Sequence, residues 1–216
     1  MAHIDDIDGI DDQHRTVPSF SPSSSARFPF PELHGHGLRL RAWDAESGVD
    51  VESWLRGCTD PEFRRWNTPL IPVTDADSAR ASLRAKAAQA EDGSMATYCV
   101  TDAGTGVPLG QIGVNAIHEE LGRASIGYWV LPEARGQGVA TRALALVTHW
   151  GHTDLGLHRL ELDHAVGHDA SCRVAERCGY RYEGTLRGSM FEAGRHDAFR
   201  DAHVHGRLAT DPLPSP

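Results

Sequence analysis

The chain has 216 residues, of which 40% are hydrophobic and 24% are charged, a composition that suits a globular protein with a buried core. Its 21 basic and 30 acidic residues give a net charge of −9, which excludes the basic face that a general nucleic-acid binder presents to phosphates. No apolar run approaches the ~18 residues of a membrane span, and the acidic N-terminus is no secretory signal. We therefore expect a cytoplasmic protein that engages neither nucleic acid nor membrane.

The first 31 residues differ in composition from the rest. Residues 1–12 hold five aspartates and neither lysine nor arginine, and residues 13–31 are rich in serine and proline. Such a segment has little hydrophobic surface to bury, so we expect residues 1–31 to form a disordered leader; an acidic arm that contacts a cationic partner or the substrate cleft is the alternative. The folded domain is expected over residues 32–210, and the proline-rich residues 211–216 form a loose end. Without the five aspartates the chain has 21 basic and 25 acidic residues, a net charge of −4, so the domain itself is only mildly acidic.

Hydrophobic spacing, capping residues and turn residues predict the elements of the domain. In chain order we expect a strand over 38–43, a helix over 49–66, a helix from Thr74 or Asp75 to Ala90, strands over 95–101, 108–118 and 124–131, a helix over 138–155, a strand over 158–166, a helix over 171–178, and strands over 180–186 and 199–208. Asp60 and Pro61 can restart the first helix, and Gly93 and Gly179 close the helices before them. This order predicts a mixed α/β domain built around one central sheet.

The segment over residues 126–141 carries the most chemical information, because a strand passes through a glycine-rich turn directly into a helix. The first amides of a helix have no internal acceptor, and the helix dipole adds partial positive charge there. Gly136 and Gly138 let the backbone approach a ligand closely, and Arg135 supplies a cation with planar donors. We expect a diphosphate-binding turn. Its predicted members are Arg135, Gly136, Gln137, Gly138, Val139, Ala140 and Thr141.

Other diphosphate motifs fit this turn poorly. The dinucleotide fingerprint G-x-G-x-x-G has Thr141 in place of its third glycine, and the Gly-Lys-Ser/Thr of a P-loop is absent. A tight turn that binds nothing is the simpler alternative.

The same residues resemble a known family. The run Arg135 to Ala140 is similar to the Q/R-x-x-G-x-G/A motif of the GNAT-superfamily N-acetyltransferases, in which this turn binds the pyrophosphate of acetyl-CoA. Further segments between residues 38 and 208 resemble the RimJ/RimL-type branch in order and spacing. They are Asp60-Pro61-Glu62 with Trp66, Ile126-Gly127-Tyr128-Trp129, Leu155-Gly156-Leu157-His158-Arg159, and Cys178-Gly179-Tyr180 with Glu183-Gly184. The resemblance implies a GNAT-like α/β fold with a mixed, mostly antiparallel central sheet flanked by helices, in which a splayed strand pair holds the acyl-CoA.

The resemblance also implies a course for the reaction. Pantetheine would lie beside the strand that ends at Val130, held by main-chain groups of Trp129 and Val130, one of which polarises the thioester carbonyl. A substrate amine would attack the acetyl group directly, while an acid protonates the CoA thiolate. Where the family has Asn-x-x-Ser, this chain has His168 to Ser171. Ser171 fits the serine near the CoA sulfur and is also an ordinary helix N-cap, whereas His168 replaces the asparagine that contacts the cofactor.

The general base is harder to assign. Relatives commonly carry a glutamate where this chain has Ser125, whose hydroxyl has no useful pKa for deprotonating an amine. His118, Glu119 and Glu120, at the end of the preceding strand, are the candidate substitutes. Each is alternatively a solvated hairpin residue, and a chain of water molecules is a further route for the proton.

The cysteines and histidines do not show the sequence spacing of a metal-binding motif. The four cysteines are widely separated, and no cysteine or carboxylate completes a zinc set next to the closely spaced histidine pairs, so no metal is expected. These pairs are His34/His36, His149/His152 and His203/His205. Cys172 is expected to be a small packed residue with nothing nearby to activate its thiol.

We therefore expect an acetyl-CoA-dependent N-acetyltransferase that uses no metal and acts on a primary amine. The acceptor stays open between a protein or peptide N-terminal amine, as the branch implies, and a small-molecule amine such as an antibiotic or metabolite. A longer acyl donor and a homodimer also stay open. The competing hypothesis is a non-catalytic or regulatory acyl-CoA-binding protein on the same fold, which the departures at Ser125 and His168 would fit.

Overall fold

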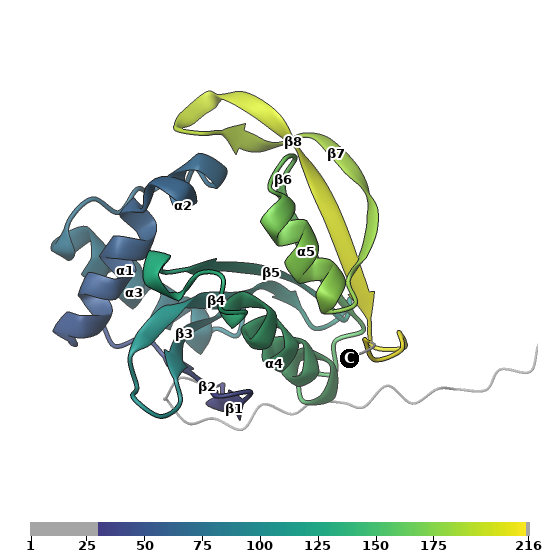
Figure 1. The fold of residues 1–216 in the computed structure, drawn as a ribbon, viewed down its shortest axis with the longest axis horizontal. Helices are drawn as coiled ribbons and strands as arrows, with labels where there is room; N and C mark the ends of the chain where they lie inside the picture. The colour runs from purple at the N-terminus through teal and green to yellow at the C-terminus, as the bar shows by residue number, and fades with distance from the viewer. Residues whose placement is uncertain (1–29, 215–216) are drawn as a thin grey trace, which may run out of the picture.

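The computed structural model describes residues 30–214, so the expectation of a disordered leader falls almost wholly outside the described residues. Within this part of the chain, eight strands form a single sheet in the order β1-β2-β3-β4-β5-β6-β8-β7. Neighbouring strands are antiparallel except β5 and β6, which run parallel (Figure 1). The strands are β1 (Leu33–Gly35), β2 (Leu38–Ala42), β3 (Ala96–Asp102), β4 (Pro108–His118), β5 (Arg123–Val130), β6 (Arg159–Ala165), β7 (Arg181–Glu192) and β8 (Arg195–Leu208).

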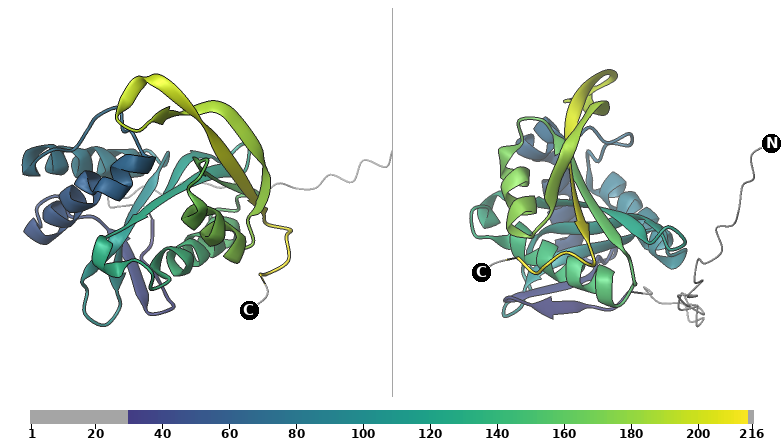
Figure 2. Two further views of the ribbon diagram at one scale, coloured as in Figure 1. Left: turned by 45° about the horizontal axis from the view of Figure 1, so that its top comes forward. Right: turned by 90° about the vertical axis from the view of Figure 1, so that its right-hand side faces the viewer.

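Helices cover both faces of this sheet. They are α1 (Gly48–Thr59), α2 (Pro61–Trp66), α3 (Ala76–Glu91), the short 3-10 helix η1 (Pro132–Ala134), α4 (Val139–Thr153) and α5 (Asp169–Arg177). On one face, Leu144 of α4 and Ala175 of α5 share a core with Tyr98 of β3. On the other face, α1 and α3 form a second core around Trp129 of β5 (Figure 2). No described helix is long and apolar enough to cross a membrane.

The division into two cores follows from the alternation of side chains along β5. Ala124 and Ile126 are buried in the core under α4, whereas Trp129 packs against Trp54 of α1. Because successive residues of a strand point to opposite faces, Tyr128 lies on the same face as Ile126 and turns toward α5. The two aromatic side chains at the end of β5 therefore serve different cores.

A gap opens between β5 and β6. The two strands pair only at Arg123–Ser125, opposite Arg159–Glu161, although β5 continues to Val130 and β6 to Ala165. The partner strand β4 carries a bulge at Ala116, which has a φ of 48°, and bulges increase the local twist of a sheet. The expected mixed, mostly antiparallel central sheet, flanked by helices and with a splayed strand pair, is therefore present.

Most predicted elements are present within a few residues of their expected ends. The short strand β1 is not among the predicted elements, and two further details differ. The helix α5 begins at Asp169 with His168 as its N-cap, so Ser171 is not the cap but lies in the first turn. The last two strands are longer than predicted, since β7 continues to Glu192 and β8 begins at Arg195. Their outer parts pair with each other beyond the end of β6 and need no further partner.

The predicted loose end is partly tied to the domain. Asp211 accepts a hydrogen bond of 2.9 Å from the Leu208 amide and lies 3.1 Å from the Arg181 guanidinium. Amino-acid composition does not predict these contacts, because a high proline content gives no information about which side chains lie within reach of a carboxylate in the fold.

Candidate functional site

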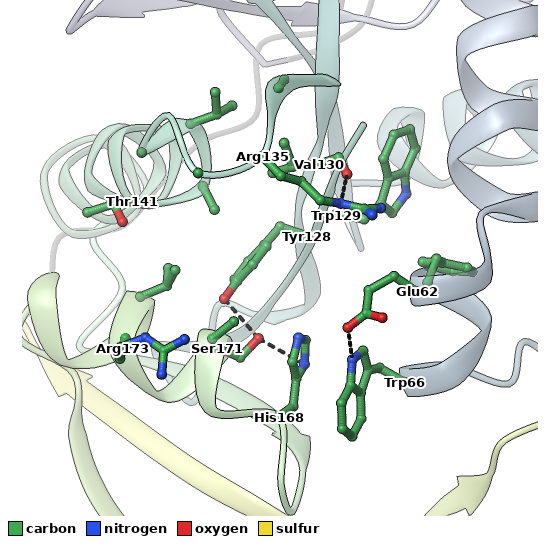
Figure 3. Close-up of a pocket in the computed structure, with 18 of the residues that line it drawn as sticks. Glu62, Trp66, Tyr128, Trp129, Val130, Arg135, Thr141, His168, Ser171 and Arg173 are labelled. Carbon is green, nitrogen blue, oxygen red and sulfur yellow. Dashed lines mark hydrogen bonds between the residues drawn. The ribbon is translucent and has the colours of Figure 1, made fainter. Parts of the chain in front are cut away.

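A cavity of about 340 Å³ lies where the gap beside β5 meets the start of α4 (Figure 3). Its walls come from α2, the end of β5, the glycine turn and α5. Most residues predicted to hold the cofactor line it: Trp129, Val130, Arg135, Gly136, Gly138, Val139, Ala140, Thr141, His168 and Ser171. Gln137 does not, because its side chain turns back and donates a hydrogen bond of 2.8 Å to the Glu133 carbonyl.

The glycine turn leaves backbone amides without acceptors at the mouth of α4. Gly136 and Gly138 have φ values of 73° and 71°, a left-handed conformation that glycine adopts without strain. The first backbone hydrogen bond of the helix runs from the Arg142 amide to the Gly138 carbonyl at 3.0 Å, so the preceding amides of the first turn have no intrahelical acceptor. A Cβ built on either glycine meets nothing within 4 Å, so open space lies before these amides. The turn is built to receive an anion.

Arg135 is not the free cation that the sequence suggested. Its guanidinium forms an ion pair with Asp60, and its Nε donates a hydrogen bond of 3.0 Å to the Val130 carbonyl. Asp60 is buried and also caps α2 by accepting hydrogen bonds from the Glu62 and Phe63 amides. Arg135 therefore ties the end of β5 to the start of α2, and Asp60 offsets its charge.

Two other arginines line the cavity from α5, and sequence analysis did not single them out. Arg173 and Arg177 are exposed, lie one helical turn apart, and have no ion-pair partner among the described residues. Their i, i+4 spacing places them on one face of α5, which was the available signal. They supply the uncompensated positive charge at the cavity rim.

A chain of hydroxyl and imidazole groups crosses the floor of the cavity. The Tyr128 hydroxyl donates a hydrogen bond of 3.1 Å to Ser171 Oγ, which lies 3.2 Å from His168 Nδ1. The His168 ring stacks on Trp66 with ring centroids 4.5 Å apart. Burial raises the pKa of Tyr128 to about 12 and lowers the pKa of His168 to about 4. At neutral pH the tyrosine is therefore protonated and the imidazole uncharged.

The residues proposed as bases lie elsewhere. His118, Glu119 and Glu120 are exposed in the hairpin between β4 and β5, and they do not line the cavity. This hairpin joins the start of β5, whereas the cavity lies at the end of that strand. The five residue steps from Arg123 to Tyr128 span about 17 Å of extended chain. Ser125 lies between and points its hydroxyl at the Asn115 carbonyl, 3.4 Å away.

One carboxylate does face the cavity. Glu62 of α2 is the only acidic residue among the described lining residues, and its Oε1 accepts a hydrogen bond of 2.7 Å from Trp66 Nε1 (Figure 3). The hydrogen bond fixes the carboxylate beside the ring that stacks on His168. The available sequence signal is its position in the first turn of α2, two residues after the capping Asp60.

The outer part of the β7–β8 hairpin forms an arch that reaches toward α2 (Figure 1). Thr68, just after α2, donates a hydrogen bond of 2.7 Å to the Glu192 carbonyl and accepts one of 3.0 Å from the Gly194 amide. Arg200 donates to the carbonyls of Arg65 and Trp66 at 3.0 and 2.6 Å. The arch thus holds the side of the cavity opposite the glycine turn.

Known proteins resemble this chain in sequence and in fold. The sequence model of the family described as acetyltransferase (GNAT) domain matches residues 37–181, which include every cavity residue named above. An uncharacterised N-acetyltransferase of Bacillus licheniformis is 27% identical over 163 residues, covering 76% of this chain and 89% of that protein. A ribosomal-protein-serine acetyltransferase of Escherichia coli strain K12 is 33% identical over 101 residues, covering 46% of this chain and 54% of that protein. The solved structure of Mycobacterium smegmatis RimJ in complex with CoA-disulfide matches with a TM-score of 0.71 at 25% identity, covering 83% of this chain and 86% of that chain.

Proposed function

We propose that this chain, which belongs to the acetyltransferase (GNAT) family of acyltransferases, moves an acetyl group from acetyl-CoA directly to a primary amine. One observation carries the proposal: the gap between β5 and β6 and the open amides of α4 meet in a single cavity. A ligand with a diphosphate at one end and an extended, amide-bearing arm at the other fits that combination. The fold of CoA-bound RimJ supports acetyl-CoA as this ligand.

The residues of the cavity divide the binding of acetyl-CoA between them. The amides after Gly138 would bind the pyrophosphate, and Arg173 and Arg177 would balance its remaining negative charge. The free edge of β5 near Trp129 and Val130 would pair with the pantetheine amides. This edge faces the gap because β6 has already diverged.

Ser171 and Tyr128 suit the role of acid. When the amine displaces CoA, the departing thiolate needs a proton, and the Ser171 hydroxyl faces the cavity with Tyr128 hydrogen-bonded behind it. The raised pKa of Tyr128 keeps its hydroxyl protonated at neutral pH, so the tyrosine stays a hydrogen-bond donor to Ser171 while the thiolate departs. His168 stays neutral, and its Nδ1 lies 3.2 Å from Ser171 Oγ, so the imidazole orients the Ser171 hydroxyl.

Glu62 suits the binding and deprotonation of the acceptor amine. Its carboxylate attracts an incoming ammonium ion, and its hydrogen bond to Trp66 holds it in place. We expect Glu62→Gln to lower kcat/KM for the amine by about 100-fold, the lower end of the contribution of general acid–base catalysis, and to leave KM for acetyl-CoA unchanged. The glutamine oxygen still accepts from Trp66, so the ring keeps its position. Glu52→Gln, on the exposed face of α1, is the matched control; equal activities of both variants would exclude Glu62.

The acceptor is best sought first among peptide N-terminal amines, with small amines as the second class. The similarity to the ribosomal-protein-serine acetyltransferase supports the first class. The test is mass spectrometry of a panel of peptides, polyamines and amino-sugar antibiotics incubated with acetyl-CoA and the full chain. Acetylation confined to peptide N-termini supports the first class, and acetylation confined to small amines assigns the second. CoA binding without any acetylated product contradicts the proposed transfer.

A further inference from the structure

A cluster of four potential metal ligands lies on the sheet beside α5, outside the cavity that we assign to acetyl-CoA. His164 belongs to β6, His203 and His205 to β8, and Cys172 to α5. One ligand atom from each residue lies within 4.8 Å of the others. We propose that these side chains bind a zinc ion in a His3Cys site.

The register of the sheet brings the three histidines together. In the antiparallel pair β6–β8, His164 lies directly opposite His203, and Leu162 lies opposite His205. His203 and His205 are two residues apart, so both point to the same face of β8, and His205 is a diagonal neighbour of His164. Cys172, in the second turn of α5, completes the set from above the sheet.

The distances between ligand atoms match the edges of a zinc tetrahedron. With Zn–N of ~2.0–2.1 Å and Zn–S of ~2.3 Å, two nitrogens lie about 3.3 Å apart and a nitrogen and a sulfur about 3.6 Å apart. His164 Nε2 is 3.4 Å from His205 Nε2 and 3.4 Å from Cys172 Sγ. Cys172 Sγ is 3.5 Å from His203 Nδ1. Three edges therefore already have the required length.

The outer hydrogen bond of His164 also suits a metal ligand. His164 Nδ1 lies 3.1 Å from the Ala165 carbonyl, so its N–H donates there and the lone pair of Nε2 points into the cluster. A hydrogen bond from the second ring nitrogen to a carbonyl is the usual way in which a metal-binding histidine is oriented. The Tyr182 ring packs against His203 and His205, at centroid distances of 5.0 and 5.7 Å, and partly covers them.

A cluster held by hydrogen bonds alone is the competing explanation. The thiol of Cys172 has one hydrogen but approaches two imidazole nitrogens, and the lone pair of His164 Nε2 meets both the sulfur and His205. Pairwise hydrogen bonds leave some of these contacts unsatisfied, whereas one cation satisfies all four atoms at once. Four protein ligands of the N and S type with no open position favour a structural zinc ion. Such an ion would fasten α5, and with it Ser171, to β6 and β8.

Zinc binding is tested on the full chain without an affinity tag, freed of metal by a chelator and titrated with ZnSO4 against a competing chromogenic chelator. We expect one ion per chain, and a loss of affinity of more than about 100-fold in Cys172→Ser and His203→Gln, because even outer-shell substitutions cost ~10–100-fold. Cys58→Ser and His149→Gln change residues outside the cluster and serve as controls. Unchanged affinity in Cys172→Ser would overturn the site, as would the absence of stoichiometric binding by the wild type.

Cobalt provides a readout that separates ligation from folding. With Co²⁺ in place of zinc, the wild type should show the thiolate-to-metal charge-transfer band of a tetrahedral site, and Cys172→Ser should lose this band. Circular dichroism and thermal shifts with acetyl-CoA show whether each variant is folded. A folded Cys172→Ser variant that keeps the band would contradict the proposal.

Discussion

At the scale of the residue, the hydroxyl pair Tyr128–Ser171 makes the sharpest statement about chemistry. Ser171 is buried and Tyr128 is partly buried, and the two residues come from elements that are far apart in the sequence, α5 and β5. Ser171 is 5% exposed and faces the cavity, so its hydroxyl reaches only the ligand side, Tyr128 and His168. If the two hydroxyls donate a proton as a pair, removing the Tyr128 hydroxyl must slow the reaction.

Replacing Tyr128 by phenylalanine tests this. The change removes the hydroxyl, keeps the ring, and leaves Ser171 without its donor. We expect kcat to fall by about 100-fold, the lower end of what a positioned acid contributes, with little change in KM for acetyl-CoA. Steady-state thiol release measures both. Tyr180→Phe is the matched control, since its buried hydroxyl bonds Thr148, 2.8 Å away and outside the cavity; an equal loss in both variants would point to stability and not to proton donation.

At the scale of the element, Asp60 and Arg135 join α2 to the end of β5. Asp60 is buried and Arg135 is 38% exposed on its side chain, so removing the arginine leaves a carboxylate poorly solvated. We expect Arg135→Met to destabilise the protein by about 2 kcal/mol, less than the ~3–5 kcal/mol of a fully buried pair. Sequence analysis predicts Arg135 only as a ligand contact of the glycine turn. Urea unfolding measures the difference.

A double-mutant cycle isolates the pair. Asp60→Asn keeps an oxygen that can cap α2 but removes the charge, so the double variant should be less destabilised than the sum of the single variants by about 1–3 kcal/mol. Arg80→Met, which breaks an exposed pair with Asp77, should stay within about 0.5 kcal/mol of wild type. Additive single effects would mean that the two side chains act independently.

The crossing of α1 over β5 depends on a glycine. A Cβ at Gly57 would overlap the six-membered ring of Trp129, which is packed between Trp43 and Trp54 and has no free direction in which to move. We expect Gly57→Ala to cost about 1–3 kcal/mol of stability, as overpacking does, despite the higher helix propensity of alanine. Gly48→Ala, at the start of the same helix and with open space around it, should be neutral or slightly stabilising. Chemical unfolding of both variants would show the contrast, and equal stabilities would contradict it.

At the scale of the whole molecule, features formed by one short segment are predictable from the sequence. Features formed by residues that meet only in the folded structure are not. The glycine turn before α4 lies within one short segment, so its motif predicts both structure and ligand class. Tyr128 and Ser171 meet only because β5 and α5 pack together, and His164 meets Cys172 and His203 only through strand register. A search by spacing along the chain treats such residues as unrelated. The candidate bases in the β4–β5 hairpin are close in sequence to β5, yet they lie at the start of that strand, outside the cavity at its other end.

Among the described residues, the two halves of the sheet pair with each other only over the short β5–β6 ladder, so acetyl-CoA in the gap should add to the contacts between them. Ligand at 100 times its Kd stabilises the folded state by about 2.7 kcal/mol. For a protein of this size each kcal/mol raises Tm by about 2–4 °C, so acetyl-CoA should raise Tm by about 5–10 °C. Differential scanning fluorimetry measures the shift.

Two controls test whether the pyrophosphate contributes to this shift. Pantetheine, which lacks the pyrophosphate, should raise Tm much less at the same concentration. The variant Gly138→Trp, which fills the open space before the α4 amides, should lose the response to acetyl-CoA. Equal shifts with both compounds would mean that the amides of α4 do not bind the pyrophosphate, because all of the stabilisation would then come from the gap beside β5.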